Sequence, residues 1–72
     1  MTIVIKSVKN NHYYITLEIE ERYGKLCYIV QACPILNKDL HLCGCPTREI
    51  TYTMDEKKKA CATFNRYTKK YI

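Results

Sequence analysis

The stretch of sequence that decides the fold is Tyr13-Tyr14-Ile15-Thr16-Leu17-Glu18-Ile19-Glu20. Its odd-numbered positions are apolar or aromatic, whereas the even-numbered positions after Tyr14 are polar. Successive side chains of a strand point to opposite faces of a sheet, so this alternation predicts a strand with one face against a core. The remaining elements are placed outward from this strand.

A second strand is expected just before it, because residues 2–8 are rich in β-branched side chains. Asn10-Asn11 lies between the two segments, and Asn tolerates the positive φ that tight hairpin turns require. The sequence therefore predicts a β-hairpin at the N-terminus.

The register of this hairpin has two solutions. A two-residue loop of Asn10 and Asn11 places Lys6 opposite Ile15 on the core face, whereas a three-residue loop pairs Ile5 with Ile15 and Ile3 with Leu17. A slip of one residue turns every side chain of a strand to the other face, so burial decides between the two. We therefore expect Ile3 and Ile5 to point inward.

A second turn is expected at Arg22-Tyr23-Gly24-Lys25, because Gly24 takes positive φ at no steric cost. A third strand from Leu26 to about Cys33 then pairs on the core face as Ile19–Tyr28, Leu17–Val30 and Ile15–Ala32. Since Pro34 cannot donate to a sheet ladder, we expect irregular chain over residues 34–46. Alternation returns over residues 47–53, which predicts a fourth strand.

The last segment predicts a helix over residues 54–71. Thr53 and Glu56 have the spacing of a capping box, in which the carboxylate reaches back to the N-cap backbone. An apolar stripe that should lie on the sheet recurs at helical spacing: Ala60, Phe64, Tyr67 and Tyr71.

These elements predict one small α+β domain over residues 1–72. Its architecture is an antiparallel meander of three to four strands with the C-terminal helix packed on one face. A chain of 72 residues is too short for a two-domain enzyme, and 47% hydrophobic residues exceeds what a disordered tail contains. No apolar run approaches the roughly 18 residues that span a bilayer.

The five cysteines bear on compartment and on metal binding. The N-terminus lacks the pattern of a secretory signal, so we expect a cytoplasmic protein with reduced thiols. One group has ligand types that suit tetrahedral zinc, although its Cys-x-Cys spacing is tighter than usual: Cys33, His41, Cys43 and Cys45. The alternative is thiols packed in a loop, with Cys43 and Cys45 pairing only on oxidation, and no other cofactor is expected.

The positive charge is concentrated in the helix. Residues 55–72 carry +4 of the net +5, and residues 1–54 carry +1. At 100° per residue a set of cationic side chains projects away from the apolar stripe: Lys58, Lys59, Arg66, Lys69 and Lys70. This face binds nucleic-acid phosphates, binds an anionic membrane surface or is a solvated surface that keeps the protein soluble. The membrane is the weaker alternative, because the core needs the apolar stripe.

A second candidate surface is the sheet face opposite the helix, where Tyr14, Ile29 and Gln31 are expected to lie together. It is the best candidate for a contact with a protein or a nucleic acid. No catalytic residues are expected, because His41 and Cys43 are close in sequence without a scaffold for a cleft, and no glycine-rich phosphate loop is present.

Three resemblances follow from these patterns. The order of strands and helix is similar to the arm-binding domain of tyrosine integrases. The run Lys57-Lys58-Lys59-Ala60 resembles the start of the final helix in double-stranded-RNA-binding domains. The chain as a whole, especially residues 58–67, resembles small accessory proteins of clostridial-type mobile elements, which implies an accessory protein with no known activity.

We therefore expect a non-enzymatic interaction protein with a protein partner and no small-molecule substrate. The partner would bind the outer sheet face or an exposed strand edge. The alternative is a nucleic-acid-binding module that uses the basic face of the helix.

Overall fold

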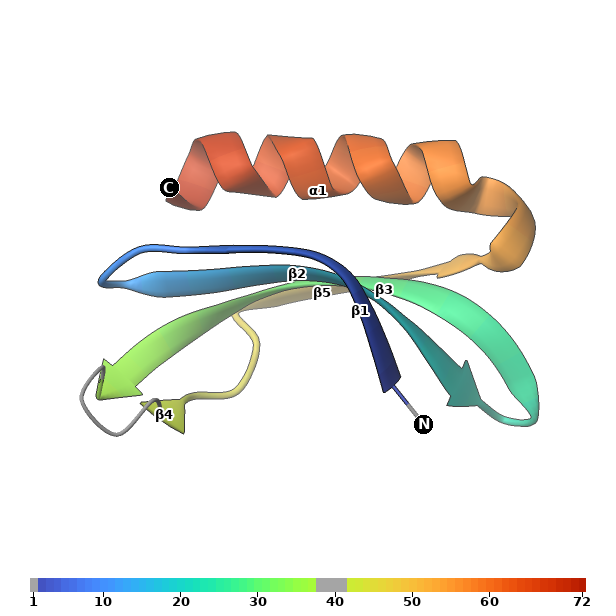
Figure 1. Ribbon diagram of the computed structural model, residues 1–72, viewed down its shortest axis with the longest axis horizontal. Helices are drawn as coiled ribbons and strands as arrows, with labels where there is room; N and C mark the ends of the chain where they lie inside the picture. Colours follow the sequence, from blue (N-terminus) through green and yellow to red (C-terminus); the bar gives the residue numbers. More distant parts are fainter. Residues whose placement is uncertain (1, 38–41) are drawn as a thin grey trace.

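The strands form one antiparallel sheet, and the C-terminal helix lies across one of its faces (Figure 1). The computed structural model describes residues 2–37 and 42–72. Its elements are β1 (Thr2–Lys9), β2 (Tyr13–Arg22), β3 (Lys25–Asn37), β4 (Leu42–Cys43), β5 (Arg48–Thr53), the 3-10 turn η1 (Met54–Glu56) and α1 (Lys57–Tyr71). The expected α+β meander with one packed helix is confirmed.

The order of the strands is β1-β2-β3, and β3 pairs with two further strands on its other side. The first part of β3 pairs with β5, from Cys27 opposite Thr53 to Ala32 opposite Arg48. Its last part pairs with the short β4. The sheet therefore ends at β1 on one side and at β5 and β4 on the other.

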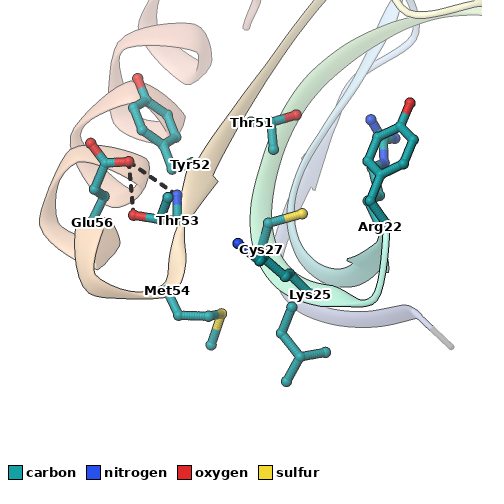
Figure 2. Close-up of a pocket in the computed structure, with 10 residues that line it drawn as sticks. Arg22, Lys25, Cys27, Thr51, Tyr52, Thr53, Met54 and Glu56 are labelled. Atoms are coloured by element: carbon teal, nitrogen blue, oxygen red, sulfur yellow. Dashed lines mark hydrogen bonds between the residues drawn. The ribbon is translucent and has the colours of Figure 1, made fainter.

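The helix begins as the capping box predicts. The Glu56 carboxylate accepts hydrogen bonds from the backbone N–H and from the hydroxyl of Thr53, both at 3.0 Å (Figure 2). The first turn is a 3-10 turn, and the α-helix proper starts at Lys57. The helix ends at Tyr71, where Lys69 and Lys70 lie at the negative end of the helix dipole.

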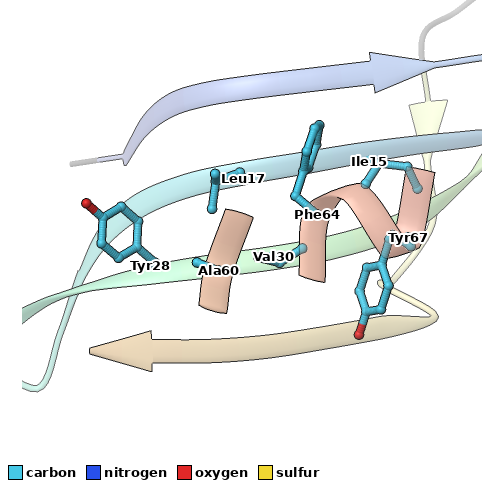
Figure 3. Close-up of a cluster of buried hydrophobic side chains, with 8 residues drawn as sticks. Ile15, Leu17, Tyr28, Val30, Ala60, Phe64 and Tyr67 are labelled. Atoms are coloured by element: carbon cyan, nitrogen blue, oxygen red, sulfur yellow. The ribbon is translucent and has the colours of Figure 1, made fainter. Parts of the chain in front are cut away.

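The core forms where the apolar stripe of α1 meets the inner face of β2 and β3 (Figure 3). Ala60, Phe64 and Tyr67 are buried, as the helical spacing predicted, and Tyr71 packs beside them. The sheet contributes alternate residues of its two central strands: Ile15, Leu17, Tyr28, Val30 and Ala32. Full burial of one such large apolar side chain contributes about 1.5–3 kcal/mol, so this cluster carries most of the stability of a chain this small.

The second hairpin has the expected register. Tyr23 and Gly24 occupy the two central turn positions with φ of 54° and 77°. Two consecutive positive φ angles are typical of the turn whose twist matches that of the flanking strands. As a result Ile19 lies opposite Tyr28 and Leu17 opposite Val30, and both pairs face the helix.

The expected register of the first hairpin is wrong. The Asn10 N–H donates to the Tyr13 carbonyl at 3.0 Å, which makes residues 11–12 the centre of the turn. Ile3 therefore lies opposite Ile19 instead of Leu17, and a bulge at Ile5 shifts the register between the two halves of β1. The expectation failed because it assumed that the helix covers β1.

The helix in fact packs on β2, β3 and β5, and the N-terminal half of β1 turns away from it (Figure 1). Ile3 and Ile5 are 49% and 39% exposed, so the expectation that they point into the core is also wrong. Val8 is the β1 residue that packs against the core, opposite Ile15.

The expectation of irregular chain from Pro34 onward is also corrected, because β3 continues to Asn37. The missing N–H of Pro34 is tolerated, since its carbonyl accepts the Gly44 N–H at 2.9 Å and the next N–H, of Ile35, donates to the His12 carbonyl at 2.8 Å. The predicted fourth strand is confirmed as β5, which starts at Arg48.

The capping box makes stability depend on pH. Hydrogen bonds from the Thr53 backbone and hydroxyl, and from Lys59, lower the pKa of Glu56 below its ordinary value. A lowered pKa in the folded state gives stability that is present above the unfolded pKa and is lost as the pH falls through the folded one. We expect the Glu56→Gln variant to lose less stability than the wild type between about pH 5 and pH 3 in urea denaturation.

The matched control is Glu21→Gln, because Glu21 is an exposed carboxylate near the end of β2. If the pH dependence of Glu56→Gln and Glu21→Gln is the same, the cap does not provide the acid-sensitive stability.

Candidate interaction surfaces

The cationic face of α1 is fully presented to solvent. The side chains expected there are all exposed: Lys58, Lys59, Arg66, Lys69 and Lys70. Residues 57–72 contain no acidic side chain. Lys59 forms an ion pair with Glu56 at 3.2 Å, and the Lys70 ammonium lies 5.4 Å from the centre of the Tyr71 ring. Most of this charge is therefore available to an anion.

The outer sheet face differs from the expected contact surface. Ile29 has no exposed surface, so it is not available to a partner and leaves the set formed with Tyr14 and Gln31. Gln31 donates from Nε2 to the Glu18 carboxylate at 2.6 Å, and Glu18 itself is 8% exposed. Two of the polar groups on this face therefore bind each other, and Tyr14 is half-buried.

Curvature of the sheet explains the burial of Ile29. The Arg22 guanidinium and the Glu49 carboxylate form an ion pair at 2.9 Å. On β3, Arg22 lies opposite Lys25 and Glu49 lies opposite Gln31. Lys25 and Gln31 are six positions apart, which is about 20 Å of extended strand. Two side chains meet over that span only if the strands bend toward the outer face, as the ends of β2 and β3 do in Figure 1.

The ion pair therefore spans the concave outer face above the part of β3 between Lys25 and Gln31, where Ile29 lies. Glu20 also lies 3.7 Å from the Arg22 guanidinium. The pKa of Arg22 is raised, first by its hydrogen bond to Glu49. A concave, internally paired face is a poor surface for a flat partner.

The exposed strand edge expected as an alternative contact surface lies at β1, which the sequence did not identify. Ile3, Val4 and Ile5 are three consecutive aliphatic residues, and each is between 39% and 49% exposed. The opposite edge is polar, since Arg48, Glu49 and Thr51 of β5 are exposed. This exposed edge could have been predicted from the number of elements, because one helix is too narrow to cover every strand of the sheet.

Two features interrupt β1 at the end of this apolar segment. The bulge at Ile5 shifts the ladder, and Lys6 lies opposite Leu17 on the side of the sheet that carries the helix. Bulges and charged residues on an edge both discourage uncontrolled pairing with other strands. The exposed apolar part of the edge is therefore short and confined to residues 3–5.

An open groove of about 650 Å³ lies at the end of the sheet where the second hairpin approaches η1 (Figure 2). Leu26 and Met54 contribute exposed apolar surface to it, and Cys27 lies in its wall. The Cys27 thiol donates to the Glu20 carbonyl at 3.3 Å and is 8% exposed.

The predicted zinc ligands are only partly within the described residues. Cys33 is half-buried and Cys45 is exposed, whereas His41 and the side chain of Cys43 lie outside what the structure describes. Among the described side chains, no group of three or more His, Cys, Asp or Glu residues is arranged to hold a metal. The zinc site stays a prediction.

Within residues 2–37 and 42–72, no helix has the length and apolar character needed to cross a bilayer. No known family model matches the chain, and comparison with curated proteins and with solved structures finds no significant match.

The closure of the outer face can be tested through Cys27, which lies beside Arg22 in the groove wall. We expect Arg22→Ala to increase the rate at which iodoacetamide alkylates Cys27, because the strand ends are no longer held together. An exposed ion pair contributes little to stability, so the expected rate increase is about a few-fold at most. Peptide mass spectrometry measures the rate at this cysteine.

Arg48→Ala is the matched control, since Arg48 is an exposed arginine on β5. A faster reaction in both variants, or in neither, would show that the Arg22–Glu49 pair does not hold the face closed.

Proposed function

We propose that this chain is a small non-enzymatic interaction module that binds an extended segment of a partner protein along β1. The observation that carries the proposal is the run Ile3-Val4-Ile5, exposed on an edge strand that the helix leaves uncovered. An edge strand offers backbone N–H and C=O groups to an added strand, and its side chains provide selectivity. The buried Ile29 directs this proposal to the edge instead of the outer face.

The partner segment is apolar and acidic. Lys6 and Lys9 lie on the same edge strand as the aliphatic run, and the chain carries a net charge of +5. Opposite charges across a strand pair stabilise it, whereas like charges destabilise it. This charge favours an acidic partner over a second copy of the chain, which would bring Lys6 and Lys9 of two molecules together.

The probes that test this are two synthetic peptides as long as β1, one alternating Val with Glu and the other alternating Val with Lys. We expect the acidic peptide to bind more tightly in fluorescence anisotropy and to slow amide hydrogen exchange in β1. The double variant Ile3→Ser/Val4→Ser removes exposed side chains and should weaken this binding about tenfold or more, as expected for roughly 1.4 kcal/mol of lost apolar contact.

Leu36→Ser is the matched control, because Leu36 is an aliphatic residue that is 69% exposed away from β1. Equal binding of the two peptides, or equal weakening by the control, contradicts the proposal. Sedimentation at the same concentrations tests the competing occupant: a dimer that the double variant dissociates would assign the edge to a second copy.

The second candidate function is nucleic-acid binding through α1, and the observation that favours it is the exposed cationic face without acidic residues. Phosphate binding by lysine and arginine releases counterions, so affinity falls as salt rises. The positions of Lys58, Lys59 and Arg66 on the exposed side of the helix suit contacts to a phosphate backbone without sequence readout.

Titration with duplex DNA and with duplex RNA at several salt concentrations tests this candidate. The triple variant Lys58→Gln/Lys59→Gln/Arg66→Gln should reduce the slope of log affinity against log salt by roughly 2–3. The control Lys6→Gln/Lys9→Gln/Lys25→Gln changes the net charge equally. If the control lowers the slope as much as the helix variant, the binding reflects net charge and not the helix face.

The cytoplasmic location and the role of a mobile-element accessory protein belong to the same proposal. They are supported by the sequence resemblance and by the thiols of Cys27, Cys45 and Cys61, none of which is in a disulfide. Fractionation of cells that express the tagged chain tests the location.

A further inference from the structure

The backbone brings Cys33 and Cys45 opposite each other. The Gly44 N–H donates to the Pro34 carbonyl at 2.9 Å, and the Thr47 N–H donates to the Ala32 carbonyl at 2.8 Å. These two bonds lie on either side of Cys45 and involve the two neighbours of Cys33. The pairing of Ile35 with Cys43 has the register of Pro34 with Gly44, whereas Ala32 pairs with Arg48, so the register shifts by two residues between Gly44 and Arg48.

This register suits a disulfide. In an antiparallel pair, hydrogen-bonded and non-hydrogen-bonded positions alternate. Pro34 and Gly44 form a hydrogen-bonded position. The Ala32 carbonyl then accepts from Thr47 instead of Pro46, so the chain has an extra residue here, and Cys45 and Pro46 both lie opposite Cys33. Residues opposite each other in an antiparallel pair have Cα atoms about 4.5–5.5 Å apart, within the range of roughly 4.4–6.8 Å that a disulfide spans.

We propose that Cys33 and Cys45 form a reactive dithiol that a low-molecular-weight disulfide oxidises to an intramolecular disulfide. One cysteine thiolate attacks the small disulfide, which forms a mixed disulfide and releases one small thiolate. The other cysteine thiolate then attacks the mixed disulfide, which closes the Cys33–Cys45 bond and releases the second small thiolate. The two cysteines are oxidised by two electrons, the small disulfide is reduced, and the two thiol protons go to solvent.

Access to solvent separates this pair from the other described thiols. Cys45 is exposed and Cys33 is half-buried, with its thiol 3.9 Å from the Gln31 side-chain oxygen. Cys27 is buried on the outer face, and Cys61 packs against the core on the helix side. Since the sheet lies between them, Cys27 and Cys61 have no route to each other.

The disulfide would fasten the segment that follows β4 to the middle of β3. In the reduced protein two backbone hydrogen bonds hold that segment. The disulfide would attach it covalently to β3 between the part that pairs with β5 and the part that pairs with β4. In a reducing cytosol such a bond is transient and reports the redox state of the thiol pool.

The test is oxidation of the full chain with glutathione disulfide, followed by non-reducing digestion and mass spectrometry. Trypsin cleaves after Lys38, which separates the two partners, and chymotrypsin cleaves after Tyr28, which separates Cys27 from Cys33. Fragmentation of the linked peptide distinguishes Cys45 from Cys43. We expect a Cys33–Cys45 link that dithiothreitol reverses.

Two variants make the assignment independent of fragmentation. Cys43→Ser should still form the link, whereas Cys45→Ser should leave Cys33 as a mixed disulfide with glutathione. Cys61→Ser is the matched control and should behave as the wild type. A Cys43–Cys45 or Cys33–Cys43 link, or only mixed disulfides in the wild type, would overturn the proposal. Circular dichroism of each reduced variant checks that it is folded.

Discussion

The packing of one helix on a sheet wider than itself is the constraint on which the rest of the structure depends. A helix with its side chains is about 10–12 Å across, and neighbouring strands are about 4.8 Å apart. The stripe around Phe64 therefore covers two to three strands and is centred on β2 and β3, with β5 at one side. The N-terminal half of β1 is left outside, and Ile3, Val4 and Ile5 face water for that reason.

The features that could be predicted from the sequence are those set by local chemistry. The capping box at Thr53, the helical stripe and the turn at Gly24 each follow from a few neighbouring residues, and all three are present. The first hairpin could not be predicted in this way. Its register depends on a side chain of Asn10 that accepts the N–H groups of His12 and Tyr13, and on a bulge that no periodic pattern reveals.

The candidate surfaces show the same division. Exposure of the helix cations follows directly from helical spacing, because the opposite stripe must be buried. The burial of Ile29 depends on how far the sheet bends. That bend brings together Arg22 and Glu49, which are 27 residues apart in the sequence. The sequence places Cys33 and Cys45 in one group of candidate metal ligands, but their position on neighbouring segments depends on the continuation of β3 past Pro34.

The bulge at Ile5 has a consequence for behaviour at high concentration. A molecule whose sheet has two free sides of different character can join head to tail, and that type of contact does not close on itself, so it leads to fibres. Here the bulge interrupts the β1 edge after a few residues. The β5 edge carries Arg48, which would lie near the lysines of the β1 edge of the next molecule. Both features disfavour growth of the chain into a cross-β polymer.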